Sequence, residues 1–312
     1  MLAVVCPGQG AQSPGMLTPW LEVPGVGDRL ARYSEVTGLD LVRLGTTGDA
    51  DEIRDTAVAQ PLLVATALVT AFALGEDAAA PDVVAGHSVG EFGALVLAGV
   101  LDAASSVRLV ALRGRAMAQA AARVPTGMSA VLGGDPDEVL ARLAELDLTP
   151  ANVNGGGQVV AAGALDALAA LAAAPPTRAK VIPLQVAGAF HTDVMASAVD
   201  ELRAAAAAVA PADPAVTLLT NADGTAVGSG ADALALVVRQ VARPVRWDLV
   251  QETMGALGVT GLLELAPGGV LAGLARRALP DVERVALKTP ADLDAARDLA
   301  ARHSGTTTKE QP

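Results

Sequence analysis

The hydrophobic and polar positions of this chain fall into two alternating patterns. Short runs that are wholly or mostly apolar, such as 2–6 and 82–85, have the length of buried strands. Between them lie longer segments with apolar residues at helical spacing, for example Leu62, Ala65 and Val69. Strands that alternate with helices favour a mostly parallel sheet, so we predict an α/β fold. Its predicted strands are residues 2–6, 82–85, 216–221 and 261–265, and its predicted helices are residues 26–36, 57–74, 89–98, 102–122, 193–209 and 231–243.

The pattern changes after Pro125. The predicted elements there are strand 128–132, helix 136–146, a hairpin of strands 151–154 and 158–162, helix 165–173 and strand 179–186. The order β-α-β-β-α-β is typical of a ferredoxin-like unit. We therefore predict that residues 124–187 form a ferredoxin-like subdomain inserted into a large domain made of residues 1–123 and 188–303. The polar residues 304–312 are predicted to be a disordered tail.

Composition narrows the classes of function. The chain has 312 residues, of which 52% are apolar, and this supports a large core. A formal net charge of −12 argues against nucleic acid as a partner, because such binders need a basic face. We expect no membrane span, because no apolar run approaches the roughly 20 residues that one needs, and the sequence shows no signal peptide pattern. We therefore expect a cytoplasmic protein with no membrane partner. Cys6 is the sole cysteine, which excludes an intramolecular disulfide and a multi-cysteine metal site, and we expect no metal.

A candidate nucleophile lies where the predicted strand 82–85 meets the predicted helix 89–98. The sequence there is Gly86-His87-Ser88-Val89-Gly90, and strand, sharp turn and helix together are the context of a nucleophile elbow. Glycine is needed on both flanks because the turn is tight. Ser88 would then stand at a helix N-terminus, where developing negative charge is favoured. The alternative is an ordinary glycine-rich turn, since this short pattern also occurs by chance.

Among the three histidines, His191 is the candidate general base. His303 lies near the end of the chain, and we expect the side chain of His87 to point away from Ser88 Oγ. If Ser88 is a nucleophile, His191 is therefore the residue left to take its proton. The alternative is that His191 only caps the helix that follows it.

The turn Pro7-Gly8-Gln9-Gly10 follows the first predicted strand. Ligands in open α/β sheets bind at the carboxyl ends of strands, so we expect Gln9 on the same edge as Ser88. The backbone N–H groups of Gln9 and Val89 would then supply the two donors that an oxyanion needs. Taken alone, this turn favours the alternative, a glycine-rich turn with an exposed glutamine.

Arg113 lies in the predicted helix 102–122, which is apolar around most of its circumference. It shares a face with Met117, four residues later. A buried arginine needs an anionic partner, and its planar fork matches a carboxylate. That partner is either a substrate or a structural Asp or Glu.

Several motifs occur together and in a fixed order. They are P-G-Q-G at 7–10, A-Q-P at 59–61, G-H-S-x-G-E at 86–91, R-G-x-x-M at 113–117, N-x-N-x-x-x-Q at 152–158, G-A-F-H at 188–191 and Q-x-x-x-P-V-x-W at 240–247. This combination, over roughly residues 1–290, resembles the malonyl-CoA:acyl carrier protein transacylase family, which includes acyltransferase domains of fatty acid and polyketide synthases.

The resemblance implies a hydrolase-like α/β domain with a ferredoxin-like insertion, acting as a monomer by a ping-pong reaction. Ser88, activated by His191, would take the malonyl group from malonyl-CoA. The phosphopantetheine thiol of an acyl carrier protein, bound transiently, would then remove it. The resemblance also implies that Arg113 holds the malonyl carboxylate. No permanently bound cofactor is implied.

Further residue roles come from the same resemblance. Met117, Phe190, Gln60 and Asn154 would belong to the substrate pocket, and a backbone carbonyl near Gln240 would orient the histidine. Phe190 resembles the malonyl-selective form of its motif, because it would crowd a 2-methyl group. Two basic pairs are candidate carrier protein contacts, Arg276 with Arg277 and Arg178 with Lys180.

Three alternatives remain at this stage. The first is an acyltransferase of the same class with a different pocket, whose donor is another acyl-CoA such as methylmalonyl-CoA. A serine esterase or thioesterase is expected to follow the order Ser…Asp…His with a histidine near the C-terminus, whereas about 120 residues follow His191. A scaffold without activity would have lost Ser88, His191 or Arg113. Whether fatty acid or polyketide synthesis is served stays open.

Overall fold

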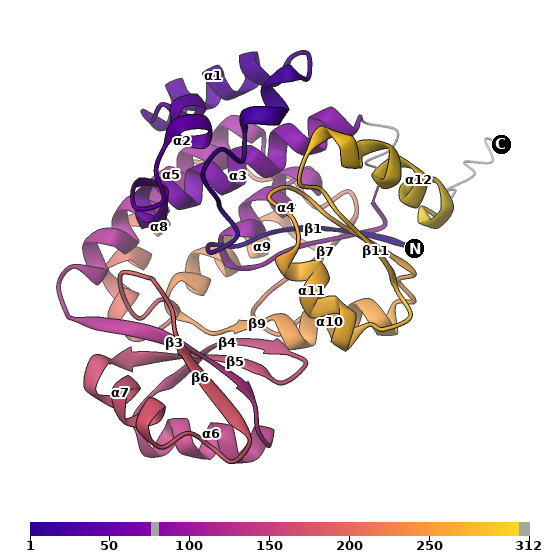
Figure 1. Ribbon diagram of the computed structural model, residues 1–312. Helices are drawn as coiled ribbons and strands as arrows, with labels where there is room; N and C mark the ends of the chain where they lie inside the picture. Colours follow the sequence, from indigo (N-terminus) through magenta and orange to yellow (C-terminus); the bar gives the residue numbers. More distant parts are fainter. Residues whose placement is uncertain (76–80, 306–312) are drawn as a thin grey trace.

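The computed structural model describes residues 1–75 and 81–305, which form an α/β fold with two sheets (Figure 1). The main sheet has six strands in the order β11-β10-β1-β2-β7-β8, and all neighbours are parallel except β7 and β8. The predicted mostly parallel sheet is therefore confirmed. Its strands are β1 (Leu2–Cys6), β2 (Val83–Gly86), β7 (Thr217–Leu219), β8 (Ala226–Val227), β10 (Gly261–Glu264) and β11 (Glu283–Ala286).

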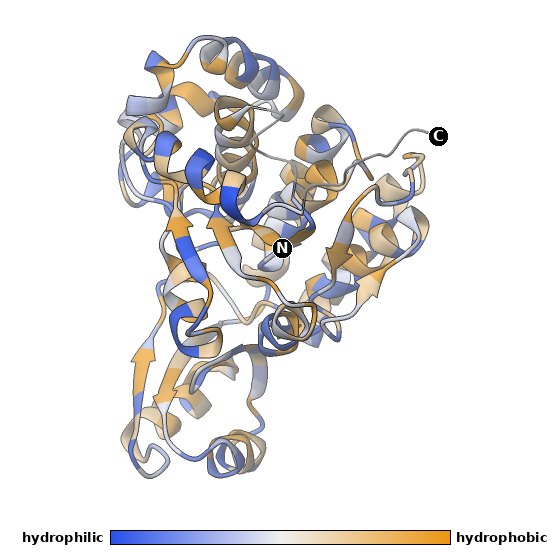
Figure 2. Cartoon of the chain, turned by 90° about the vertical axis from the view of Figure 1, so that its right-hand side faces the viewer, coloured by the Kyte–Doolittle hydropathy of each residue, from blue (hydrophilic) through white to orange (hydrophobic). Residues whose placement is uncertain are grey.

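The central strands β1 and β2 are buried at every residue, as expected for parallel strands covered on both faces. The apolar strands can be followed in Figure 2, which colours each residue by hydropathy. In the register of this pair, Cys6 lies opposite Gly86. The two strands therefore end side by side, and the turn that follows β1 meets the turn that carries Ser88.

Helices cover both faces of the main sheet. Leu2, Val4 and Cys6 of β1 pack into the larger core, whereas Ala3 and Val5 point into a second core on the opposite face. The second core contains residues of α10 (Trp247–Ala256) and α11 (Val270–Ala278). The larger core contains residues of α1 (Val26–Thr37), α2 (Leu41–Thr47), α3 (Thr56–Leu74), α4 (Glu91–Leu97), α5 (Ala103–Ala121), α8 (Ala196–Ala206), α9 (Gly230–Arg239) and α12 (Leu293–His303).

Helix α3 corrects one expectation from the sequence. By length and composition it is apolar enough to cross a membrane, although we expected no such segment. Most of the helix is buried inside the protein, where it packs closely along α5. Its all-round apolar character is therefore explained by its position as a core helix.

The second sheet has the order β6-β3-β5-β4-β9 and lies below the main sheet in Figure 1. Its first four strands and two helices follow the predicted order β-α-β-β-α-β, and neighbouring strands among these four are antiparallel. The fifth strand, β9 (Val245–Arg246), pairs parallel with β4 and comes from outside residues 124–187. The other elements here are β3 (Thr126–Gly133), α6 (Pro136–Glu145), β4 (Thr149–Gly155), β5 (Gln158–Ala164), α7 (Leu165–Ala173) and β6 (Ala179–Pro183).

Some predicted helices are shorter than expected, with a 3-10 helix at one end. The predicted helix 231–243 ends as α9 at Arg239 and continues as a 3-10 helix through Gln240–Ala242. Most of the predicted disordered tail, residues 306–312, lies outside the described residues. The 3-10 helices are η1 (Thr18–Glu22), η2 (Glu52–Arg54), η3 (Ser88–Gly90), η4 (Asp193–Met195), η5 (Gln240–Ala242) and η6 (Pro290–Asp292).

Candidate active site

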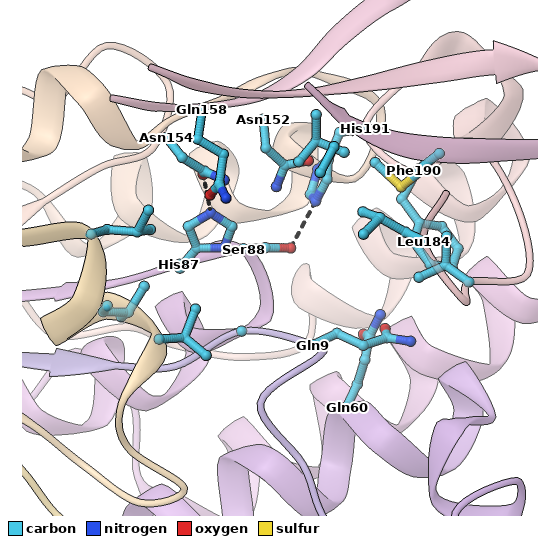
Figure 3. A pocket seen from close by; sticks show the side chains of 18 of the residues that line it. Gln9, Gln60, His87, Ser88, Asn152, Asn154, Gln158, Leu184, Phe190 and His191 are labelled. Atoms are coloured by element: carbon cyan, nitrogen blue, oxygen red, sulfur yellow. Dashed lines mark hydrogen bonds between the residues drawn. The ribbon is translucent and has the colours of Figure 1, made fainter. Parts of the chain in front are cut away.

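A cavity of about 210 Å³ lies where the carboxyl edge of the main sheet faces the second sheet (Figure 3). Gly8, Gln9, His87 and Ser88 come from the turns after β1 and β2, and strands β3, β4 and β5 supply the opposite wall. The lining residues are Gly8, Gln9, Gln60, His87, Ser88, Met117, Met128, Ala130, Asn152, Asn154, Gln158, Val160, Leu184, Val186, Phe190, His191, Val270, Leu271 and Leu274.

Ser88 lies on the predicted sharp turn, between β2 and α4. Its φ of +52° is in the left-handed region, which non-glycine residues seldom adopt outside functional turns. A Cβ on Gly86 would lie 2.0 Å from the backbone carbon of Gly90, and one on Gly90 would lie 2.2 Å from Cys6 O. Glycine is therefore required at both flanks, as the sequence pattern predicted.

His191 contacts Ser88 directly. The distance from Ser88 Oγ to His191 Nε2 is 2.7 Å, and His191 Nδ1 lies 2.8 Å from the backbone oxygen of Gln240. Because a carbonyl oxygen only accepts, Nδ1 must donate, which leaves Nε2 as the acceptor for the Ser88 hydroxyl. Burial and the nearby charge of Arg113 lower the pKa of His191 to about 3. The imidazole is therefore neutral and able to accept a proton at neutral pH.

Arg113 is buried, with 1% of its surface exposed, and it lies near Ser88 without lining the cavity. Its Nη1 donates to Gln60 Oε1 over 2.7 Å, and its Nη2 donates to Gln240 Oε1 over 2.9 Å and lies 3.4 Å from Ser88 Oγ. Burial lowers the pKa of Arg113 to about 10, so the guanidinium stays charged. Among the described residues no carboxylate lies within ion-pair distance of it. The structural Asp or Glu considered as its partner is therefore not found at ion-pair distance, although the buried Glu91 carboxyl lies near enough to act against the lowering of the Arg113 pKa.

The backbone N–H groups near Ser88 differ in availability. Ser88 N donates to Asn221 Oδ1 over 2.8 Å and is therefore occupied. Within the described residues, Val89 N and Gln9 N donate to no protein acceptor. The side chain of Gln9 donates to Thr56 Oγ1 over 3.3 Å. Gly8 packs so closely on His87 that a Cβ would lie 2.7 Å from His87 O, so the turns of Gln9 and Val89 are held together.

His87 points away from Ser88 Oγ, as predicted, and faces the second sheet (Figure 3). Its Nε2 lies 2.9 Å from Asn154 Oδ1, and Asn154 Nδ2 donates to Gln158 Oε1 over 2.9 Å. Burial lowers the pKa of His87. Asn152 Oδ1 is buried beside the same cavity without a protein partner among the described residues. The cavity thus offers an unpartnered acceptor to a bound molecule.

The predicted pocket residues surround the cavity. Met117, Phe190, Gln60 and Asn154 all line it, and Gln60 Nε2 lies 3.5 Å from Met117 Sδ. Val89, Arg113 and Gln240 are not in its lining. Arg113 Nη2 lies near Ser88 Oγ, the backbone oxygen of Gln240 accepts from His191 Nδ1, and Val89 follows Ser88 in the chain. No group of three or more His, Cys, Asp or Glu side chains is arranged to hold a metal in the described ranges.

Two buried residues beneath the site received no role in the sequence analysis. Asn221 lies two residues after β7, where its Oδ1 accepts from Ser88 N and its Nδ2 donates to Gly86 O over 2.8 Å. Glu91 accepts from Asn221 N over 2.7 Å and from Gln240 Nε2. Burial raises the pKa of Glu91 to about 8, against the lowering effects of Asn221 and Arg113. Glu91 belongs to the G-H-S-x-G-E motif, which was the available signal, whereas Asn221 had none.

Comparison with known proteins agrees with this geometry. The model of the acyl transferase domain family matches residues 3–289. A protein of Mycobacterium tuberculosis named malonyl CoA-acyl carrier protein transacylase is 53% identical over 302 residues, which cover 96% of this chain and 100% of the relative. The chain belongs to the malonyl-CoA:acyl carrier protein transacylase family. A family member from Escherichia coli is 37% identical, with 95% of this chain and 99% of the relative covered.

Solved structures of the family share the fold. The crystal structure of MCAT from Mycobacterium tuberculosis superposes with a TM-score of 0.92 at 53% identity, covering 95% of this chain and 99% of that chain. A second structure is of a type II PKS acyl-carrier protein in complex with its malonyl-transacylase. It gives a TM-score of 0.88 at 34% identity and covers 95% of this chain and 99% of that chain. The mixed α/β architecture is therefore that of the transacylase family.

Proposed function

We propose that this chain transfers a malonyl group from malonyl-CoA to the phosphopantetheine thiol of an acyl carrier protein, through an ester on Ser88. The observation that carries the proposal is the buried charge of Arg113, which has no carboxylate partner in the described part of the chain and lies 3.4 Å from Ser88 Oγ. A nucleophile beside an unpaired buried cation suits an acyl group that carries its own carboxylate.

In the first half-reaction, His191 Nε2 takes the proton of Ser88 as Oγ attacks the thioester carbon. The N–H groups of Val89 and Gln9 stabilise the resulting oxyanion. When the tetrahedral intermediate collapses, the C–S bond breaks, the proton on His191 goes to the CoA sulfur, and malonyl-Ser88 remains. The hydrogen bond from Nδ1 to Gln240 O holds the imidazole in the tautomer that this step requires.

In the second half-reaction, the thiol of the carrier protein replaces CoA. Its proton passes to His191 Nε2 as its sulfur attacks the ester carbon. The bond between the acyl carbon and Ser88 Oγ then breaks, and Oγ takes the proton back from His191. Arg113 holds the malonyl carboxylate in both steps. The carboxylate takes the place of Gln60 Oε1, while Gln240 Oε1 keeps its hydrogen bond to Nη2. The unpartnered Asn152 Oδ1 is suited to an N–H of the pantetheine arm.

Phe190 and Met117 form the apolar part of the acyl pocket, and Phe190 restricts substituents on the malonyl C2 carbon. Arg276 and Arg277 lie in the last turn of α11, whose earlier residues line the cavity. They are suited to contact an acidic carrier protein. Arg178 and Lys180, beside and in β6, are a second candidate contact.

We further propose that residues 1–123 with 188–303 act as the large hydrolase-like domain and residues 124–187 as a ferredoxin-like subdomain. The strand order β6-β3-β5-β4 supports the second assignment. The protein would act as a cytoplasmic monomer without a bound cofactor.

The experiment is a transfer assay with purified protein, malonyl-CoA and holo acyl carrier protein, followed by the mass of the carrier protein. The expected result is malonyl-loaded carrier protein. When both substrates are varied, double-reciprocal plots of the initial velocity are expected to give parallel lines. Efficient loading from methylmalonyl-CoA but not malonyl-CoA would overturn the assigned donor. Release of free malonate without carrier loading would indicate a thioesterase.

A further inference from the structure

Glu91 is a buried carboxyl group for which the transfer steps above have no use. It is the first residue of α4, 5% of its surface is exposed, and it does not line the active-site cavity. No Lys, Arg or His lies within ion-pair distance of it among the described residues. Carboxyl groups are seldom fully buried unless they are paired, so its contacts need an explanation.

Both oxygens of Glu91 accept hydrogen bonds from N–H donors. Oε1 accepts from Asn221 N over 2.7 Å, and Oε2 accepts from the side-chain nitrogen of Gln240. The same nitrogen faces Ser88 O at 3.2 Å and Asn221 Oδ1 at 3.0 Å. Three acceptors therefore surround the NH₂ group of Gln240, and its oxygen is left to face Arg113 Nη2 at 2.9 Å.

The ionised form of Glu91, which dominates above its pKa of about 8, suits this position better than a carboxamide does. A glutamine at residue 91 would point its NH₂ group at either the Asn221 N–H or the Gln240 NH₂, so one donor would face another. Turning the Gln240 amide over would relieve the conflict, but its NH₂ group would then face the guanidinium of Arg113. The orientation of the Gln240 amide therefore depends on whether residue 91 offers two acceptor oxygens, as a carboxylate does, or one oxygen and one NH₂ group.

We propose that Glu91 is a positioning residue that orients the Gln240 amide so that its oxygen holds Arg113 in place for the acyl carboxylate. This inference rests on the proposed function. The backbone oxygen of Gln240, which holds His191, does not depend on the orientation of the side chain. Loss of Glu91 therefore impairs carboxylate recognition more than the attack by Ser88.

The test compares wild type, E91Q, Q240A and the E91Q/Q240A double variant. The readout is the rate of acyl-Ser88 formation with malonyl-CoA and with acetyl-CoA, which lacks the carboxylate. Assays at about pH 8.5 keep Glu91 mostly ionised, because its pKa is about 8. E91Q is expected to lower kcat/KM for malonyl-CoA by about tenfold or more, mainly through KM, and to change acetyl-CoA by less than about threefold. Because Glu91 acts through Gln240, the double variant is expected to be no worse than Q240A.

Equal losses for both substrates, or losses that multiply in the double variant, would overturn the proposal. If E91Q does not fold, E91D takes its place, because it keeps the charge and draws the oxygens back from Gln240. The same malonyl-selective loss is expected for E91D, and an equal loss for both substrates contradicts the proposal. Failure of the proposed function would look different, because wild type itself would then form no malonyl adduct.

Discussion

Arg113 donates a hydrogen bond to the side-chain oxygen of Gln240 over 2.9 Å, while the backbone oxygen of Gln240 receives the Nδ1–H of His191. One residue therefore holds both the buried cation and the general base on either side of Ser88. Neutral amide oxygens solvate Arg113 without cancelling its charge. An incoming carboxylate can replace the Gln60 oxygen and form the stronger charge-assisted pair, while the Gln240 oxygen keeps Arg113 in place.

Removal of the cation should affect malonyl and acetyl groups differently. We expect Arg113→Ala to lower kcat/KM for malonyl-CoA by about 30-fold to 1,000-fold, equivalent to about 2–4 kcal/mol. Acetyl transfer should be retained or increased. Arg113→Lys is the matched control, since it keeps the charge but loses the two-pronged geometry, and it should fall in between. Unchanged malonyl kinetics in the alanine variant would refute the assigned role of Arg113.

The pH dependence of acylation follows from the lowered pKa of His191. The neutral imidazole is the form that accepts the Ser88 proton, and its pKa of about 3 lies far below the ordinary value of 6.5. Lowering the pH from about 7 to about 5 should therefore leave kcat/KM unchanged for acylation of Ser88 by acetyl-CoA, which does not depend on carboxylate recognition. In Arg113→Ala the lower limit of activity should move to higher pH, because the charge of Arg113 is one cause of the shift. An inflection near pH 6.5 in wild type would contradict this description.

The turn around Ser88 should tolerate no side chain at Gly86. A Cβ there would lie 2.0 Å from the Gly90 backbone, which has no room to move away. We expect Gly86→Ala to lower the free energy of unfolding by about 3 kcal/mol or more, measured by urea denaturation. Gly27→Ala in α1 is the control, since a Cβ there meets nothing within 4 Å and alanine favours the helix. Equal stability of the two variants would show that the turn can relax.

The sequence predicts the fold best where the pattern of adjacent residues is enough to specify an element. Fully apolar strands such as β1 and the strand–turn–helix around Ser88 were visible, because each is specified by adjacent residues. The strands β8 and β9 have two residues each, too few to show a period, and β9 joins a sheet formed mainly by an earlier part of the chain. The helical spacing of Leu62, Ala65 and Val69 predicts the helix α3 but not its burial on nearly all sides, because packing on all sides is a tertiary property.

The candidate site was predictable only to the extent that motifs mark it. Ser88 and His191 are 103 residues apart and were paired by chemistry and elimination, and the structure brings them within 2.7 Å. Asn221 was missed because its role depends on contacts with Ser88 and Gly86, more than 130 residues earlier in the chain. No periodicity or spacing records such a contact.

Phe190 is expected to set selectivity at the malonyl C2 carbon. It is buried and lines the cavity together with Met117, so its ring occupies space that a 2-methyl group would need. Phe190→Ala should raise kcat/KM for methylmalonyl-CoA relative to malonyl-CoA by about tenfold to 100-fold, because one methyl group in a pocket is worth about 1–3 kcal/mol. Competition assays with both thioesters measure this ratio directly. An unchanged ratio would place the selectivity elsewhere in the pocket.

The central claim is that Ser88 carries the malonyl group between its two thiol partners. Intact-protein mass spectrometry after brief mixing with malonyl-CoA tests it most directly, with Ser88→Ala as the comparison. We expect a malonyl adduct on wild type alone. It should disappear when holo acyl carrier protein is added, and the malonyl group should then be found on the carrier. An adduct that persists in Ser88→Ala, or one that only water removes, would contradict it.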